Sequence, residues 1–103
     1  MRIMGIDYGD ARTGLAVSDE MNILVGEAWT LNEWNPERVA DVIAQEAQKR
    51  NVRRLVLGLP KNMDGSEGPR AEKCRDFAEL LRSKTDIELV MCDERRSSIE
   101  AHA

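Results

Sequence analysis

The sequence predicts an α/β fold in which one mixed, five-stranded β-sheet carries helices on its faces. Strand-like apolar stretches fill the first third of the chain, two amphipathic helical patterns follow, and a near-continuous apolar run lies between them. Strands joined by short connections pair antiparallel, whereas strands separated by helices pair in parallel. The length of 103 residues, with 42% hydrophobic and 33% charged residues, fits one small domain.

Three strands are expected first. They cover residues Arg2–Tyr8, Gly14–Ser18 and Ile23–Leu31. The stretch from Gly9 to Gly14 forms the first turn, and a polar corner over residues 19–22 forms the second. Because both connections are short, these strands should form an antiparallel meander.

A helix is expected to begin at Asn35-Pro36-Glu37, where an N-cap residue, a proline and an acid stand together. It should end near Arg50-Asn51. Apolar side chains recur along one side of this helix at Val39, Val42, Ile43 and Ala47.

The remaining elements follow a simple alternation. The run Leu55–Leu59, ended by Pro60, is typical of a strand buried on both faces. A second helix should start near Pro69, after a loop rich in Gly, Pro, Asn and Asp. Its apolar stripe is Cys74, Phe77, Ala78 and Leu81. A fifth strand is expected over Ile87–Cys92, and the S-x-x-E pattern from Ser97 predicts a third helix. This order of elements is that of the ribonuclease H-like fold.

Composition excludes several classes of protein. No apolar stretch approaches the ~20 residues that a membrane span requires, and Asp7 comes too early for a secretory signal, so we expect a cytoplasmic protein. Cys74 and Cys92 lack the spacing of a disulfide framework or zinc site, and His102 is the one histidine. The net charge of −4 argues against nucleic-acid binding through bulk charge but leaves a local site open.

Acidic residues stand where two of the expected strands end. Asp7 closes the first strand, and Asp93 and Glu94 close the fifth. Ligand sites of α/β sheets lie at the carboxyl ends of parallel strands, where these acids would repel unless Mg²⁺ or Mn²⁺ neutralised them. Two such ions suit hydrolysis of a phosphodiester bond. Asp7 alone could equally be a solvated turn residue, and only one of the adjacent acids Asp93 and Glu94 should face it, because neighbours on a strand point to opposite faces.

Other candidate residues have a structural alternative as well. The loop GLPKNMDGSEG could cradle a phosphate with Lys61 and its backbone amides, or be an ordinary connector. Arg12 could bind a phosphate or simply lie on the surface. Trp29 and Trp34 flank the entry to the first helix, where packing against the sheet is favoured over base stacking.

Three stretches together resemble the YqgF family of Holliday-junction-resolvase-like nucleases, whose members are candidate nucleases for pre-16S ribosomal RNA. They are GIDYGDARTGLAVSD, LGLPKNMDGSEGPRAEKCRDFAELL and DERRSSIEA, and the resemblance covers essentially the whole chain. It implies a ribonuclease H-like fold, phosphodiester cleavage with Mg²⁺ or Mn²⁺, and a ribosomal RNA precursor or branched DNA as partner. It also implies that Asp7, Asp93 and Glu94 are catalytic and bind the metal. The residues that it implies for phosphate or nucleic-acid binding are Gly9, Arg12, Lys61, Asn62 and Arg95.

Members of that family continue with a further helical segment that carries another aspartate, whereas this sequence ends at Ala103. We therefore expect residues 1–103 to form a single domain without that helix, with an uncovered sheet face that favours a homodimer. The alternative function is a non-catalytic module that binds nucleic acid or the ribosome. The stretch GIDYG also looks like the first phosphate loop of actin-type and sugar-kinase proteins, but a chain of this length lacks the second lobe of an ATP site.

Overall fold

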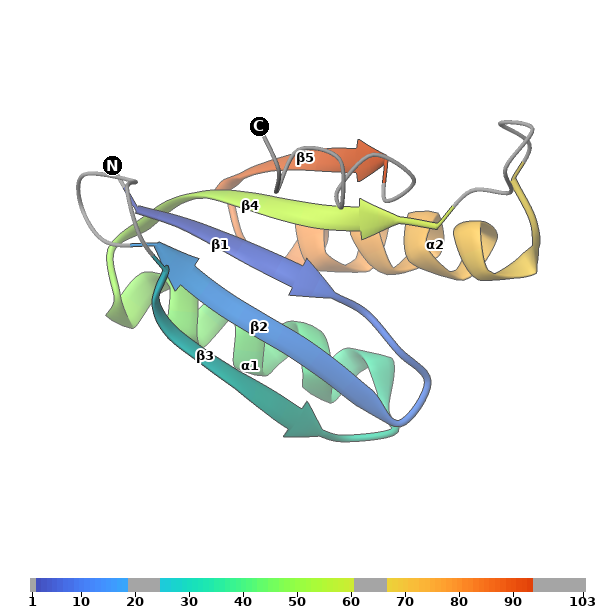
Figure 1. Ribbon diagram of the computed structural model, residues 1–103, viewed down its shortest axis with the longest axis horizontal. Coiled ribbons are helices and arrows are strands. Elements are labelled where there is room, and N and C mark those ends of the chain that lie inside the picture. The colour runs from blue at the N-terminus through green and yellow to red at the C-terminus, as the bar shows by residue number, and fades with distance from the viewer. Residues whose placement is uncertain (1, 19–24, 61–66, 94–103) are drawn as a thin grey trace.

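The computed structural model describes residues 2–18, 25–60 and 67–93. Its elements, in chain order, are β1 (Arg2–Asp7), β2 (Arg12–Ser18), β3 (Val25–Asn32), α1 (Pro36–Lys49), β4 (Val52–Leu59), α2 (Pro69–Lys84) and β5 (Glu88–Asp93) (Figure 1). The predicted order of three strands, helix, strand, helix and strand is confirmed. The predicted third helix lies outside the described residues.

The five strands form one sheet in the order β3-β2-β1-β4-β5. β1 pairs antiparallel with β2, and β2 with β3, as their short connections predict. β4 pairs in parallel with β1, and β5 with β4, after connections that pass through α1 and α2. The carboxyl ends of β1, β4 and β5 therefore lie at the same edge of the sheet, which we call the carboxyl edge.

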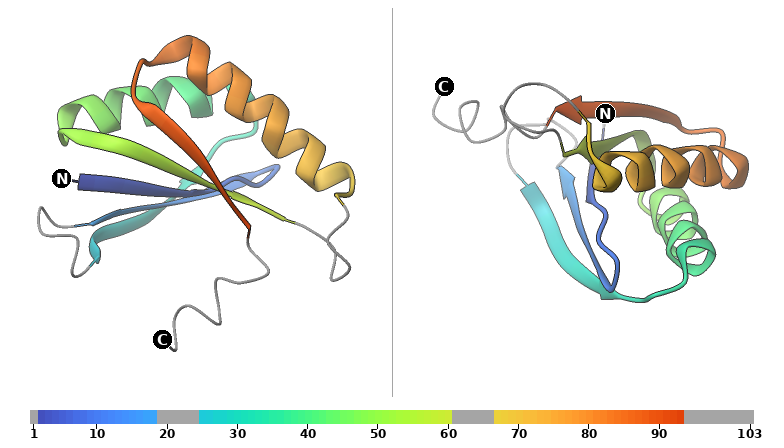
Figure 2. Two further views of the ribbon diagram at one scale, coloured as in Figure 1. Left: turned by 90° about the horizontal axis from the view of Figure 1, so that it is seen from above. Right: turned by 90° about the vertical axis from the view of Figure 1, so that its right-hand side faces the viewer.

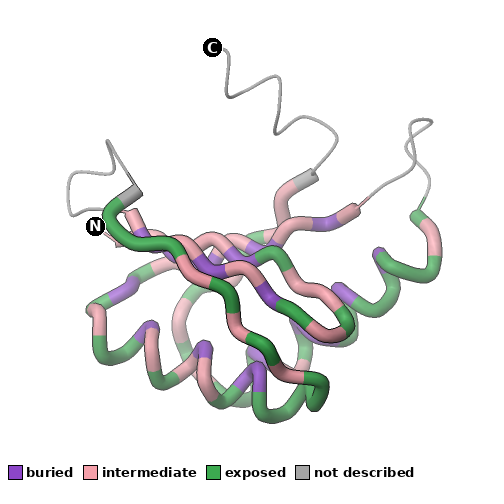
Figure 3. Tube along the Cα trace, turned by 60° about the horizontal axis from the view of Figure 1, so that its bottom comes forward, coloured by how far each residue is buried: buried purple, intermediate pink, exposed green. Residues whose placement is uncertain are grey.

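Both described helices cover the same face of the sheet (Figure 2). Every second residue of the central strands points toward them, so Met4 and Ile6 of β1 and Leu55 and Leu57 of β4 are almost fully buried. Buried helix residues face these strands (Figure 3). They are Val39, Ala40, Ile43 and Ala47 of α1 and Ala71, Cys74, Phe77, Ala78 and Leu81 of α2. The stripe predicted for α2 is confirmed, and in α1 only Val42 is half-buried instead of buried.

The other face of the sheet is not covered by either described helix, and we call it the open face. Val56 and Gly58 of β4 lie on it and are half-buried, and Val90 of β5 beside them is 40% exposed. The prediction that β4 is buried on both faces is therefore wrong for the described part of the chain. An apolar run indicates a central strand, but it does not tell whether a helix covers each face.

The start of α1 follows the predicted capping chemistry. The side-chain oxygen of Asn35 accepts a hydrogen bond of 2.9 Å from the backbone N–H of Glu37, and Pro36 occupies the first helical position. The helix ends at Lys49, close to the predicted end, and Asn51 follows with a positive φ of 57°. Neither α1 nor α2 is both long and apolar enough to cross a membrane.

Candidate active site

Asp7 is the last residue of β1, so its carboxylate stands at the carboxyl edge of the sheet. It is exposed on the open face, and its register partner on β2 is Gly14. A Cβ atom at Gly14 would lie 3.6 Å from the Cβ of Asp7, an ordinary van der Waals contact. Glycine at this position therefore leaves space beside the Cβ of Asp7.

Asp7 also has open space toward β4 and β5. Ile6 pairs with Leu57, which makes Asp7 level with Gly58, and Gly58 pairs with Cys92 of β5. All three of Asp7, Gly58 and Cys92 line one cavity of about 590 Å³ on the open face. Since Gly58 carries no side chain, groups on β1 and β5, whose backbones are about 10 Å apart, can approach one another across β4.

The second candidate acid comes from the end of β5. Asp93 is its last residue and pairs through the backbone with Leu59, so the predicted meeting of the two strand ends at one edge is confirmed for the backbone. Glu94, Lys61, Asn62 and Arg95 lie outside the described residues. Within residues 2–18, 25–60 and 67–93, no three His, Cys, Asp or Glu side chains gather as metal ligands.

The turn between β1 and β2 is tightly wound beside Asp7. A Cβ atom at Gly9 would lie 2.4 Å from the backbone oxygen of Arg12, closer than real atoms approach, so only glycine fits this turn without a backbone shift. Arg12 is the first residue of β2 and is exposed. The turn is tied to the segment before α1, because the N–H of Glu33 donates to the carbonyl oxygen of Ala11 at 3.2 Å.

Tyr8 anchors the carboxyl end of β1 to α2. Its ring stacks on Phe77 with ring centroids 4.1 Å apart and planes within 7° of parallel. Burial raises the pKa of the Tyr8 hydroxyl above its usual value, and the nearby Asp10 and Cys74 add to that rise. Asp10 itself pairs with Lys73 of α2 at 3.2 Å.

Neither Tyr8 nor Lys73 was predicted from the sequence to lie near the site. The position of Tyr8 next to a strand-ending acid was visible in the sequence. The contact of Lys73 with Asp10, 63 positions away, was not, because it depends on how α2 returns to the sheet.

The two tryptophans behave differently. Trp29 packs against the core with its ring 4.6 Å from the Arg50 guanidinium, so the predicted packing against the sheet is confirmed for it. For Trp34 that prediction is wrong, because its residue surface is 76% exposed. The reason is that Trp34 lies in the connection between β3 and the N-cap of α1, beyond the last sheet residue.

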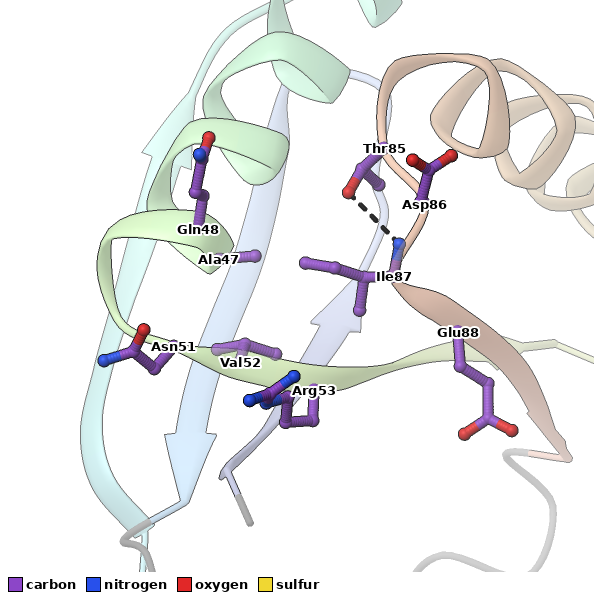
Figure 4. Close-up of a pocket in the computed structure, with 9 residues that line it drawn as sticks. All are labelled: Ala47, Gln48, Asn51, Val52, Arg53, Thr85, Asp86, Ile87 and Glu88. Carbon is purple, nitrogen blue, oxygen red and sulfur yellow. Dashed lines mark hydrogen bonds between the residues drawn. The ribbon is translucent and has the colours of Figure 1, made fainter.

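A different cavity, of about 630 Å³, lies at the opposite edge of the sheet, where β4 and β5 begin (Figure 4). Its lining residues are Ala47, Gln48, Asn51, Val52, Arg53, Thr85, Asp86, Ile87 and Glu88. None of the predicted site residues is among them, so this cavity is separate from the candidate active site.

Comparison with known proteins decides the family. A family model described as RuvX, Holliday junction resolvase, matches residues 1–103. The chain belongs to the RuvX family. This membership confirms the resemblance to Holliday-junction-resolvase-like nucleases that the three sequence stretches indicated.

A relative of this chain supports this assignment, and two solved structures of other proteins resemble its fold. A protein of Halothermothrix orenii named "Putative pre-16S rRNA nuclease" is 45% identical over 101 residues, which cover 98% of this chain and 72% of the relative. The structure of Thermus thermophilus RuvC in complex with Holliday junction substrate matches with a TM-score of 0.66 at 8% identity, over 93% of this chain and 66% of that one. The nuclease domain of the large terminase subunit gp2 of bacterial virus Sf6, a structure with manganese, matches with a TM-score of 0.55 at 16% identity, over 89% and 37% of the two chains. At such low identity the two structures show that the fold is shared, and the predicted ribonuclease H-like fold is confirmed.

Proposed function

We propose that this chain is a divalent-metal-dependent endonuclease that hydrolyses phosphodiester bonds in structured nucleic acid. The observation that carries the proposal is the exposed carboxylate of Asp7 at the carboxyl edge, beside a cavity of about 590 Å³ that Gly14 and Gly58 keep open. Carboxyl edges are where ligands bind in α/β sheets. Membership of a resolvase family supports the same reading.

Asp7 fits the role of a metal ligand. Its carboxylate is an oxygen donor, the kind that Mg²⁺ and Mn²⁺ prefer, and it faces free space with no described cation paired to it. A bound divalent ion would supply an activated water and neutralise charge on the leaving oxygen. Asp7 would hold that ion in place, and the small residues around it would leave room for the phosphate.

For the second acid we favour Glu94 over Asp93. Cys92 lines the same open-face cavity as Asp7. Side chains on an extended strand return to the same face every second residue, and the position that follows Cys92 in that period is 94. This proposal predicts that Glu94→Gln reduces cleavage as strongly as Asp7→Asn, whereas Asp93→Asn reduces it less.

We propose phosphate-binding roles for the remaining predicted residues. Arg12 is exposed at the start of β2, one tight turn from Asp7, and can donate to a phosphate from there. Gly9 keeps that turn narrow enough for close approach of a backbone. Lys61, Asn62 and Arg95 retain the phosphate-binding roles that the family resemblance implies.

The substrate that we propose first is the ribosomal RNA precursor, because the relative with 45% identity carries a pre-16S rRNA nuclease name. A four-way DNA junction is the second substrate, from the description of the family. A homodimer and a cytoplasmic location remain expectations, and sedimentation equilibrium of the full chain measures the first of them.

The test compares the wild-type chain with Asp7→Asn on a pre-16S rRNA fragment and on a four-way DNA junction, with and without Mn²⁺. Binding is measured beside cleavage. We expect metal-dependent cleavage by the wild type and a cleavage rate at least about a hundredfold lower in Asp7→Asn. Mutation of a group that only hydrogen-bonds a metal ligand already lowers activity or metal affinity by about 10- to 100-fold. Asp86→Asn is the matched control, because Asp86 is an exposed acid at the opposite edge of the sheet.

Two outcomes would contradict this proposal. Equal cleavage by the wild type and Asp7→Asn would remove Asp7 from the site. Binding of either substrate without any metal-dependent cleavage would favour the non-catalytic module instead.

A further inference from the structure

We infer that Trp34 and the apolar groove beside it hold one unpaired nucleobase of the substrate. The groove has a volume of about 330 Å³ and lies between the β1–β2 turn, the entry to α1 and one side of α2. This inference rests on the proposed function, because it names the part of the nucleic acid that the site recognises.

The floor of the groove is aromatic and fixed. The stacked rings of Tyr8 and Phe77 line it, together with Leu80. Phe77 is only 2% exposed, so its ring is held by the core and keeps the Tyr8 ring in place. Planar, apolar surfaces of this kind favour a planar ligand that stacks.

Trp34 forms one wall of the groove and is 76% exposed. Its backbone is well held despite this exposure. The Glu33 carboxylate accepts hydrogen bonds from the backbone N–H of Trp34 at 2.9 Å and of Asn35 at 3.2 Å. An exposed indole on a fixed backbone loses little conformational freedom on binding, as expected of a stacking platform.

The position and size of the groove favour nucleic acid over protein as its occupant. Tyr8, on its floor, directly follows Asp7, the proposed metal ligand. Lys73 and Asp10, which pair with each other at 3.2 Å, also line the groove, together with Asp76. Arg70 lines a small adjoining cavity with Gly9 and is available for a phosphate beside the base. A partner helix would need a groove long enough for several turns, whereas about 330 Å³ is at the small end of the range for ligand pockets.

The experiment measures binding of the full chain, without metal, to two RNA hairpins. One hairpin carries a single-stranded 5′ extension and the other has a blunt end. DNA hairpins of the same sequences show whether the groove takes an unpaired base of RNA, of DNA or of both. The variants are Trp34→Leu, which removes the ring but keeps apolar surface, and Trp34→Phe, which keeps a ring. Val90→Ser is the matched control, because Val90 is another exposed apolar residue but lies on the open face.

We expect Trp34→Leu to weaken binding of an extended hairpin about tenfold, because loss of one base–aromatic stack lowers the affinity by about that factor. Its affinity for the blunt hairpin should equal that of the wild type. Trp34→Phe should retain most of the affinity, and Val90→Ser all of it. The extended hairpin should also quench tryptophan fluorescence in the wild type but not in Trp34→Phe. Because Trp34 is mostly exposed, both of its variants should unfold at the temperature of the wild type.

Three results would overturn the inference. The first is equal affinity of Trp34→Leu and the wild type for every extended hairpin. The second is an equal loss of affinity by Trp34→Leu for extended and blunt hairpins. The third is that the wild type binds none of the hairpins. The first would remove Trp34 from nucleic-acid binding. Cleavage lost in Asp7→Asn, together with unchanged binding in Trp34→Leu, would refute this inference and leave the proposed function intact.

Discussion

Three glycines near Asp7 allow a sharp test of how the open face and its turn are built. Alanine at Gly9 would bring a Cβ to 2.4 Å from the backbone oxygen of Arg12, whereas at Gly14 it would meet the Asp7 Cβ at 3.6 Å, and at Gly5 the nearest contact is the Ala16 oxygen at 3.9 Å. The same substitution therefore meets a backbone clash at Gly9, a contact with the proposed metal ligand Asp7 at Gly14, and a looser contact with a backbone oxygen at Gly5.

The magnitudes follow from these distances. Replacing a strand glycine with alanine removes a conformational cost of about 0.5–1 kcal/mol, so Gly5→Ala should be neutral or slightly stabilising. At Gly9 a backbone shift is required, and overpacking of this kind costs about 1–3 kcal/mol. For a domain of this size, each kcal/mol lowers the melting temperature by about 4–8 °C. Gly14→Ala should leave the stability nearly unchanged but place a methyl group against the Asp7 side chain.

Urea denaturation gives the free energy of unfolding for each variant, and the cleavage assay gives its activity. We expect Gly9→Ala to lose stability, Gly14→Ala to keep stability but lose activity, and Gly5→Ala to keep both. If Gly9→Ala is as stable as the wild type, the turn is not tight enough to exclude a Cβ at this position. If Gly14→Ala cleaves at the wild-type rate, the space beside Asp7 is not needed for the reaction.

Two further predictions concern the elements that hold the site. Tyr8 is the one tyrosine, and its pKa in the folded chain is raised above the unfolded value of 10.0. The neutral hydroxyl therefore favours the folded state. This contribution to the free energy of unfolding is complete below pH 10 and is lost as the pH rises through the folded pKa. The free energy of unfolding of the wild type should therefore fall more steeply above pH 10 than that of Tyr8→Phe, and parallel pH profiles would contradict the burial of the hydroxyl. Asn35→Ala should cost about 1 kcal/mol through loss of the α1 cap, whereas Asn35→Asp should retain the stability, and equal losses in the two would exclude the capping role.

Much of this fold could be predicted from local sequence signals. The Asn35-Pro36-Glu37 start of α1 was predicted at the correct residue, because capping depends on neighbours in the chain. The stripe of α2 through Cys74 and Phe77 followed from helical periodicity. The position of Asp7 at the end of β1 came from strand alternation and was also correct.

Features that depend on contacts between distant segments could not be predicted in this way. Whether Val56 is covered depends on which face each helix crosses, and a continuous apolar run is the same in both cases. The exposure of Trp34 depends on where β3 ends, which the prediction placed at Leu31 and the structure places at Asn32. For such residues an apolar side chain gave the wrong expectation, because composition predicts burial only on average.

The end of β1 connects the two sites that we propose. Asp7 lies on the open face, and the next residue, Tyr8, stacks on α2 at the other side of the sheet. A nucleic-acid strand that contacts both must therefore cross the carboxyl edge, where the turn with Gly9 and Arg12 lies. A continuous duplex is too stiff to follow such an edge, since double-stranded DNA has a persistence length of about 150 base pairs, whereas an unpaired segment bends freely. The geometry of this one strand end thus favours substrates with unpaired nucleotides next to the bond that is cut.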